Sequence, residues 1–312
     1  MKFLVTGAAG FLGSACVKQL RERGHEVITT DRRGSIDRPG NLASDVFCRT
    51  LPDVDSVIHC AAVQYVSNDV PLIRRREYFH LNNVVATRNV CSRYSIDGTH
   101  LIHVGTSMMY EQSGLEIYGT GSAMKGQGVY SESKVRAQAH VDRIADRAAT
   151  VIPCIIGGPG REGLFRGFVN SMVRHGFVMF PGTGRHKTHM VHVEDVAALL
   201  VGIGERRAIG RYNAAGPRPL SILGWISEIE SALNLEPVRR VPLPLWLARS
   251  LAAASGYRLL AEEQLLMLAQ DHVLSVKESE ALGWRPRHDN GAIVRDIARH
   301  IAGTQRRVAA QQ

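Results

Sequence analysis

A tyrosine and a lysine four positions apart, Tyr130 and Lys134, follow Gly128 in a segment predicted to be helical as far as about Ala148. Side chains with this spacing lie on one face of a helix. A phenol has a reference pKa of about 10, so moving its proton near neutral pH requires a neighbour that favours the phenolate. The ammonium group of Lys134 would favour it. The pair therefore predicts general acid–base chemistry.

Thr106 supplies a hydroxyl group that is expected to join this pair. It follows the predicted strand Thr99 to Gly105, and active groups are typical at the carboxyl ends of parallel strands. Its hydroxyl could bond a substrate oxygen while the proton moves. A single hydroxyl group is usually structural, so the prediction rests on the three residues together and on the elements that position them.

The first of those elements is a strand, a glycine loop and a helix at the start of the chain. Phe3 to Thr6 forms the predicted strand, and the glycines at 7, 10 and 13 follow with the spacing G-x-x-G-x-x-G. Glycines permit a tight turn and a close approach of the backbone to a ligand. The predicted helix Phe11 to Arg23 then directs unpaired N–H groups and its positive end toward that place. The arrangement suits a diphosphate.

A carboxylate and a second strand end complete a dinucleotide pattern. The predicted strand His25 to Thr30 ends at Asp31, at the distance from the glycines where such folds place a carboxylate on the adenosine ribose. Asp31 favours NAD, whereas Arg32 and Arg33 could bind the additional phosphate of NADP. We therefore expect NAD and leave NADP open. Small residues after the predicted strand Asp55 to Cys60 would let a flat ring or ribose approach closely.

The order of strands and helices predicts an α/β fold, with a Rossmann-type doubly wound parallel sheet and a smaller, mostly helical C-terminal lobe that binds substrate. Residues 1–156 form the predicted dinucleotide-binding domain, and residues 190–215 return to it. Residues 157–189 and 216–303 form the predicted lobe. Residues 304–312 are polar enough to be a mobile tail.

Composition excludes several classes of protein. The 312 residues are 45% hydrophobic and 21% charged, and none of their apolar runs approaches the ~20 residues of a membrane span. Five cysteines without a C-x-x-C pair indicate reduced thiols in a cytoplasmic protein. Thirteen histidines without H-E-x-x-H give no metal motif. The net charge of +9 comes from short, scattered basic groups, which favours attraction of an anionic cofactor over nucleic-acid binding.

These motifs resemble the extended short-chain dehydrogenase/reductase family, which includes nucleotide-sugar epimerases, dehydratases and 3β-hydroxysteroid dehydrogenase-like reductases. The resemblance covers nearly the whole chain. Thr6 to Gly13 fits the family's T-G-x-x-G-x-x-G, Tyr130 to Lys134 its Y-x-x-x-K, Thr106 its Ser/Thr four residues before Tyr110, Asn83 its N-V-x-G-T-x-N asparagine, Asp45-Val46 its adenine-contacting Asp-Leu, and Leu282 to Pro286 its L-G-W-x-P.

The resemblance implies roles for these residues. Tyr130 would be the general acid and base, Lys134 would orient the nicotinamide ribose and lower the tyrosine pKa, and Thr106 would position the reacting oxygen. Ser107 would substitute for Thr106 or assist it. Hydride would move between C4 of nicotinamide and a carbinol or carbonyl carbon. The implied cofactor contacts are Gly7, Gly10, Phe11, Leu12, Gly13, Asp31, Arg32, Asp45, Val46, Cys60, Ala61, Ala62, Asn83, Tyr130, Lys134 and Pro153.

The family also implies a homodimer. Its members usually pair through two long helices, here predicted at Leu72 to Tyr94 and Val129 to Ala148, which form a four-helix bundle with those of a second chain. The other expected partner is a small-molecule substrate.

Departures from the family pattern rank its activities. Dehydratases follow the threonine with Asp-Glu, whereas Ser107-Met108 stands here, which argues against dehydration. Met108 and its neighbour Met109, together with Phe165 and Phe168, indicate either a less polar substrate or a packed core; both interpretations stay open.

Two further departures concern nucleotide sugars. Enzymes that bind them commonly carry arginines where this chain has Thr188 and Ile152, although Arg185 and Lys187 could still hold a phosphate. The residues therefore favour an alcohol or ketone oxidoreductase, with a nucleotide-sugar epimerase as the alternative. A nucleotide-sensing regulator is less favoured, because such proteins often lose the tyrosine or the lysine.

Overall fold

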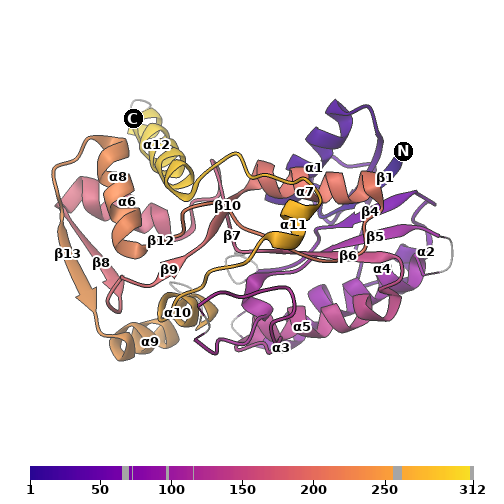
Figure 1. Cartoon of the computed structure of the whole chain (residues 1–312), viewed down its shortest axis with the longest axis horizontal. Coiled ribbons are helices and arrows are strands. Elements are labelled where there is room, and N and C mark those ends of the chain that lie inside the picture. The colour runs from indigo at the N-terminus through magenta and orange to yellow at the C-terminus, as the bar shows by residue number, and fades with distance from the viewer. Residues whose placement is uncertain (65–69, 72, 96–97, 115, 256–261, 310–312) are drawn as a thin grey trace.

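Seven parallel strands form the central sheet of the computed structural model, which describes residues 1–64, 70–71, 73–95, 98–114, 116–255 and 262–309 (Figure 1). Their spatial order is β11-β6-β5-β4-β1-β2-β3. The strand order reverses beside β1, which pairs with β2 on one side and β4 on the other. The bounds are β1 (Lys2–Thr6), β2 (Glu26–Asp31), β3 (Arg38–Pro39), β4 (Ser56–His59), β5 (His100–Val104), β6 (Ala148–Pro153) and β11 (Gly210–Ala214).

Helices cover both faces of this sheet, as the alternation of apolar residues along β1 requires. Phe3 and Val5 are buried against α1 (Phe11–Glu22) and α7 (Val193–Arg206), which lie together on one face. Leu4 points to the other face and packs with residues of α4 (Ala86–Arg93), α5 (Val129–Val141) and the short α2 (Asp45–Arg49) (Figure 1). The predicted Rossmann-type doubly wound fold is confirmed.

The helix predicted from Leu72 to Tyr94 consists of three segments. Residue 72 lies outside the described residues; α3 (Arg75–Phe79) continues through a π-helical turn, η1 (His80–Val85), into α4. Such turns widen a helix locally and often occur at functional sites. Here the turn carries Asn82 and Asn83.

The helix predicted to reach Ala148 ends earlier. After α5 a 3₁₀ turn, η3 (Asp142–Ile144), closes the helix, and Ala148 and Ala149 begin strand β6, where they pair with Leu101 and Ile102 of β5. Alanine favours helices, but both alanines are buried in the sheet. Tertiary packing therefore overrides their local preference.

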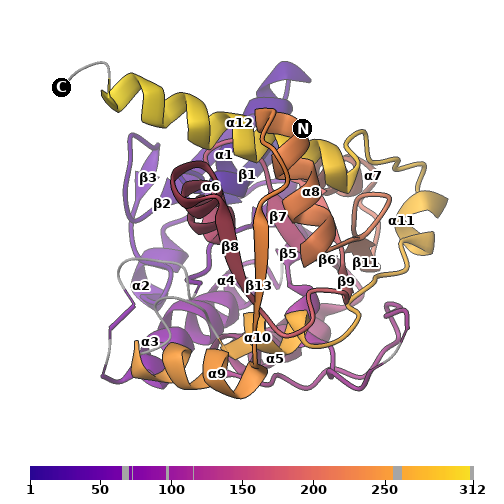
Figure 2. The same cartoon turned by 90° about the vertical axis from the view of Figure 1, so that its left-hand side faces the viewer.

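The smaller lobe has its own core around Trp225, Met172 and Ile297. It contains α6 (Gly163–His175), α8 (Ile222–Leu233), α9 (Leu245–Ala254), α10 (Glu262–Leu268) and α12 (Asn290–Ala309), with the paired strands β8 (Phe177–Pro181) and β13 (Arg239–Leu243) (Figure 2). Short pairs join β7 (Ile155–Gly157) to β10 (Met190–His192) and β9 (Lys187–Thr188) to β12 (Leu220–Ser221), and α11 (Lys277–Ala281) packs beside β11.

The last helix is longer than predicted. The sequence predicts helix from Gly291 to Ala302 and a tail after Gly303, but α12 continues to Ala309. Ile293, Ile297 and Ile301 recur on its buried face and anchor it to the lobe. None of the described helices is long and apolar enough to span a membrane.

Replacing Gly13 by alanine is expected to destabilise the protein. A Cβ atom there would lie 2.1 Å from the Gly7 carbonyl oxygen, so the backbone would have to shift, at a cost of about 1–3 kcal/mol. Gly167 of α6 is the matched control, because a Cβ atom on it would meet no atom within 4 Å. Gly167→Ala should leave stability unchanged or raise it by up to about 1 kcal/mol. Urea unfolding of both variants measures the difference, and equal midpoints would contradict the close contact.

Candidate active site

Two cavities open at the carboxyl ends of the strands and meet at Gly7, Gly10, Cys60 and Ala62. The Tyr130 cavity has a volume of about 300 Å³ and the Asp31 cavity about 330 Å³. Together they follow the crevice beside β1, where the strand order reverses and where doubly wound folds bind their ligands.

The glycine loop forms the junction of the two cavities. Gly7 has a φ of +65°, and a Cβ atom on it would lie 2.7 Å from the Ala61 nitrogen; only glycine fits this contact. The Ala61 N–H donates to the Thr6 hydroxyl oxygen at 3.2 Å, which holds the ends of β1 and β4 together. Gly10 precedes α1 and provides no side-chain cap, so the first N–H groups of the helix stay available to a ligand.

The carboxylate of Asp31 is fixed at the rim of the second cavity. It accepts hydrogen bonds from the backbone N–H groups of Ala9 at 3.1 Å and Arg32 at 2.6 Å. The Arg32 guanidinium donates to the side-chain oxygen of Asn82 at 2.9 Å, and Arg33 also lines this cavity. Asp31, Arg32 and Arg33 thus line the same cavity, and their contact with a ribose stays a prediction.

The predicted adenine contacts Asp45 and Val46 do not line either cavity. They form the first turn of α2, where Asp45 pairs with Arg49 at 2.7 Å and Val46 is 76% exposed. Their predicted contact with adenine stays a prediction.

Asn41 and Leu42 line the Asp31 cavity instead. The chain returns to the crevice just before them, because the Gly40 N–H donates to the Asp31 carbonyl oxygen at 2.9 Å. In the sequence these two residues are a polar residue followed by leucine, one position beyond the short strand β3. The pair predicted from the sequence, Asp45-Val46, lies four residues later.

Asn83 joins neighbouring segments by hydrogen bonds and does not line the two cavities. Its side-chain amide bonds both the N–H and the carbonyl oxygen of Val63, at 2.8 and 3.1 Å, and donates to the Ser133 hydroxyl oxygen at 2.9 Å. It is 1% exposed, with no face left for a ligand. Asn83 therefore positions the segment that carries Cys60, Ala61 and Ala62, all of which line the crevice.

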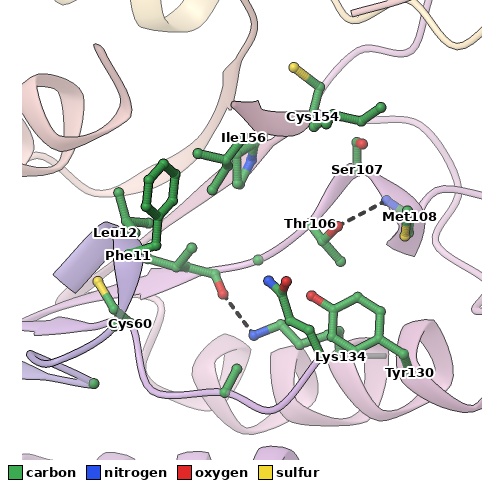
Figure 3. A pocket seen from close by; sticks show the side chains of 18 of the residues that line it. Phe11, Leu12, Cys60, Thr106, Ser107, Met108, Tyr130, Lys134, Cys154 and Ile156 are labelled. Atoms are coloured by element: carbon green, nitrogen blue, oxygen red, sulfur yellow. Dashed lines mark hydrogen bonds between the residues drawn. The ribbon is translucent and has the colours of Figure 1, made fainter. Parts of the chain in front are cut away.

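The structure brings Tyr130, Thr106 and Lys134 into one cavity (Figure 3). Phe11 and Leu12 of α1 face them across it. Pro153 also lines the cavity. Ser107 also lines the cavity, but its hydroxyl oxygen lies 2.8 Å from His272 Nε2. The side chain positioned beside the phenol is therefore that of Thr106.

The phenol of Tyr130 lies in a strongly shifted environment. Burial, with a smaller contribution from the charge of Glu263, raises its pKa, and the net value is about 12. The positive charge of Arg161 lowers the pKa, as does hydrogen bonding to Thr106 and Gln64.

Lys134 has a different environment from the one predicted. Its ammonium donates to the Val104 carbonyl oxygen at 2.7 Å and lies 3.4 Å from His103 Nε2, and both Lys134 and Val104 line the cavity. Burial lowers its pKa to about 7, although the electrostatic interaction with Cys60 acts to raise that pKa. Arg161 is the cation that lowers the pKa of Tyr130 in the ligand-free protein, and the expected action of Lys134 on the phenol stays a prediction.

Arg161 was not predicted as a site residue. It follows the loop Gly157 to Gly160, and its backbone N–H bonds the Gly158 carbonyl oxygen at 3.1 Å. Its guanidinium donates to the Gln64 side-chain oxygen and lies 5.7 Å from the centre of the Phe11 ring. The signal available in the sequence is a lone arginine at the carboxyl end of a strand.

Glu263 was also missed. It extends from α10 of the smaller lobe, and its Oε1 accepts hydrogen bonds from the backbone N–H groups of Tyr130 at 3.0 Å and Ser131 at 3.3 Å. A carboxylate at the start of a helix stabilises it, and Gly128 at that end has no side chain of its own to do so. No local pattern distinguishes Glu263 from other glutamates; the contact spans 133 positions.

Thr188 and Ile152, which the sequence analysis compares with arginines of relatives, are both buried. Thr188 is 1% exposed and Ile152 is fully buried in β6. Arg185 and Lys187 are exposed and do not line either cavity. Of the four apolar side chains noted in the sequence, Met108 lines the Tyr130 cavity, whereas Met109, Phe165 and Phe168 belong to the packed cores.

One group of side chains among the described residues has the composition of a metal site. Ligand atoms of His192, Glu194 and His288 lie within 4.8 Å of one another. However, His192 Nδ1 accepts the backbone N–H of Glu194 at 3.3 Å, and His288 Nδ1 lies 3.0 Å from an Asp195 oxygen. His192 therefore caps α7 and carries its proton on the nitrogen that a metal would need.

Comparison with known proteins agrees with this geometry. A model of the NAD dependent epimerase/dehydratase family matches residues 3–215. Mouse sterol-4-alpha-carboxylate 3-dehydrogenase, decarboxylating, is 26% identical over 274 residues, which cover 80% of this chain and 74% of that protein. UDP-glucose 4-epimerase of Vibrio cholerae is 23% identical over 303 residues, which cover 91% and 90%.

Solved structures share the fold. UDP-glucose 4-epimerase of Thermus thermophilus in complex with NAD aligns over 97% of this chain and 99% of its own, with a TM-score of 0.76 and 20% identity. At that identity the likeness shows the architecture alone.

Removing the charge of Glu263 is expected to lower the pKa of Tyr130. Glu263→Gln keeps an oxygen that accepts the N–H groups at the start of α5, so a titration of turnover that follows the phenol should move to lower pH, whichever direction of reaction is measured. Glu132→Gln is the matched control. Glu132 lies in the first turn of α5, the turn whose N–H groups Glu263 accepts, but its carboxylate pairs with Arg76 at 3.0 Å. An unchanged pH profile in Glu263→Gln, or equal shifts in both variants, would refute the assigned influence.

Proposed function

Given that the chain belongs to the NAD dependent epimerase/dehydratase family, whose members include dehydrogenases, reductases and epimerases, we propose that it is an oxidoreductase that transfers hydride between nicotinamide and a carbinol or carbonyl carbon of a small molecule. One observation carries the proposal: Tyr130, Thr106 and Lys134 share a cavity that is continuous with the glycine loop and the N-terminus of α1.

The two cavities suggest how the cofactor would lie. Asp31, with Asn41 and Leu42, would receive the adenosine, and the N-terminus of α1 its diphosphate. The nicotinamide would then enter the Tyr130 cavity beside Pro153. The family is NAD-dependent, and NAD is also the form that the carboxylate of Asp31 favours, although Arg32 and Arg33 leave NADP open.

Each catalytic group would have a separate task. In oxidation, Tyr130 as phenolate would take the proton of the carbinol hydroxyl. A bound nicotinamide would supply the redox chemistry by accepting the hydride of the carbinol carbon. In reduction, the phenol returns that proton. Thr106 bonds the reacting oxygen. Lys134, with a pKa near neutrality and an ammonium already bonded to a backbone carbonyl, would hold the ribose.

A nucleotide-sugar epimerase is the second candidate, and one observation favours it. The Vibrio cholerae epimerase aligns with nearly the whole chain, whereas the mouse dehydrogenase aligns with less of it. Against it stands buried Thr188, at the position where an arginine would hold a diphosphate, and buried Ile152 replaces another arginine that is usual in the family.

The first experiment separates these candidates. Freshly purified protein is denatured, and the supernatant is assayed for NAD and NADP. Empty sites that bind added nucleotide reversibly are expected, because an oxidoreductase exchanges its nucleotide after each turnover. Near-stoichiometric NAD retained through purification would instead support an epimerase.

Tyr130→Phe is expected to abolish catalysis and spare the cofactor. Loss of the proton donor should lower kcat by about a hundred-fold or more, with the NAD dissociation constant nearly unchanged. Tyr118→Phe is the matched control, because Tyr118 is equally buried but lies outside both cavities. Retained turnover in Tyr130→Phe would rule out the acid–base role.

We also propose a cytoplasmic homodimer. The five cysteines are free thiols, as expected in a reducing compartment. The surface that η1 and α5 share is exposed and includes Leu81, which is 44% exposed. Light scattering should give twice the chain mass of 34.3 kDa, and a mass of one chain would contradict the dimer.

A further inference from the structure

We propose that the substrate carries an oxyanion, most simply a carboxylate close to the reacting carbon, and that the guanidinium of Arg161 binds it. This inference rests on the proposed hydride transfer and names the substrate class of the same site. Arg161 lines the Tyr130 cavity together with largely apolar residues such as Phe11, Met108 and Met267.

The charge of Arg161 has no counter-ion among the described residues. Its side chain bonds the neutral amide oxygen of Gln64 and lies beside the Phe11 ring, and no described carboxylate comes within 4.0 Å of it. The neighbouring Glu162 does not serve, because it pairs with Arg166 on the same helix. A half-buried guanidinium without an anion is costly, and an incoming carboxylate would offset that cost.

Two other arginines of the lobe have acidic partners. Arg295 pairs with Glu228, and Arg240 pairs with Glu230 at 2.9 Å. Lys134, the other cation of the cavity, donates its short bond to the Val104 carbonyl oxygen. Arg161 is thus distinguished by an unpaired charge directed at the site.

The position of this charge indicates what it would bind. Arg161 is the strongest favourable charge acting on the Tyr130 phenol, so the guanidinium lies close to the reacting oxygen. A carboxylate one or two carbons from the carbinol could reach Arg161 while the hydroxyl meets Tyr130 and Thr106. The planar guanidinium can bind both carboxylate oxygens at once, and Gln64 fixes its orientation.

A second source of oxyanion has to be separated from the substrate. The diphosphate of the cofactor would lie at the N-terminus of α1, and Arg161 contacts Phe11, the first residue of that helix. The two assignments differ in outcome: a diphosphate contact affects cofactor binding, whereas a substrate contact affects the preference for acids.

The test compares 3-hydroxy acids of increasing chain length with their methyl esters. NADH formation is followed in the presence of NAD, for the wild-type protein, Arg161→Met and Arg161→Lys. Arg185→Met is the control, because Arg185 is exposed and lies outside the cavities. In parallel, the NAD-loaded proteins are titrated calorimetrically with the same acids and with inorganic phosphate, and NAD binding is measured for each variant.

The expected result is a kcat/KM for acids about ten-fold to a hundred-fold above that for esters, which Arg161→Met abolishes, Arg161→Lys partly retains and Arg185→Met leaves intact. Equal turnover of acids and esters, or the same acid preference in Arg161→Met, overturns the inference while the proposed function stands. Weaker NAD binding in Arg161→Met with an unchanged acid preference assigns Arg161 to the cofactor and also overturns it.

Absence of hydride transfer from every compound counts against the proposed function. The calorimetric titration then decides the inference by itself: acid binding that Arg161→Met removes supports it. No binding of acids, or binding of phosphate alone, overturns it.

Discussion

The contact between the Gly7 carbonyl and Gly13 is the constraint on which the site depends. A Cβ atom at Gly13 would lie 2.1 Å from that oxygen, so α1 can pack this closely against the loop only because both residues are glycine. The same loop presses Gly7 against the backbone of Ala61, which joins the first helix to the end of β4. The glycine loop, the start of α1 and the end of β4 are thereby packed against one another.

The catalytic helix α5 is held from three sides in a similar way. Lys134 bonds the end of β5 through the Val104 carbonyl, and Ser133 accepts a hydrogen bond from Asn83. The third attachment comes from the other lobe, where Glu263 accepts the first N–H groups of the helix. Preorganised supports of this kind keep a reacting group in place. The orientation of Tyr130 thus depends on how the lobe packs against the sheet domain.

The sequence predicts the parts of this arrangement that depend on local spacing. The glycine loop, Asp31 and the Tyr130–Lys134 pair lie within short motifs, and the structure places them along one crevice. Arg161 and Glu263 could not be found that way, because their partners lie 97 and 133 positions away. An intermediate case is a local pattern that occurs twice, as with Asn41-Leu42 and Asp45-Val46. Only the path of the chain shows that the first pair lines the Asp31 cavity.

The charges around Tyr130 explain why both lobes are needed. Burial is the main cause that raises the pKa of the phenol. The two charges that act on the phenol, Arg161 and Glu263, both come from the smaller lobe, whereas Lys134 and Thr106 come from the sheet domain. Glu263 raises the pKa and accepts hydrogen bonds from helix N–H groups, whereas Arg161 lowers it and has no acidic partner among the described residues. The ligand-free crevice therefore has a positive excess, from Arg161 and from the N-terminus of α1. An anionic ligand would complete it, and its arrival would also change the pKa of the group that moves the proton.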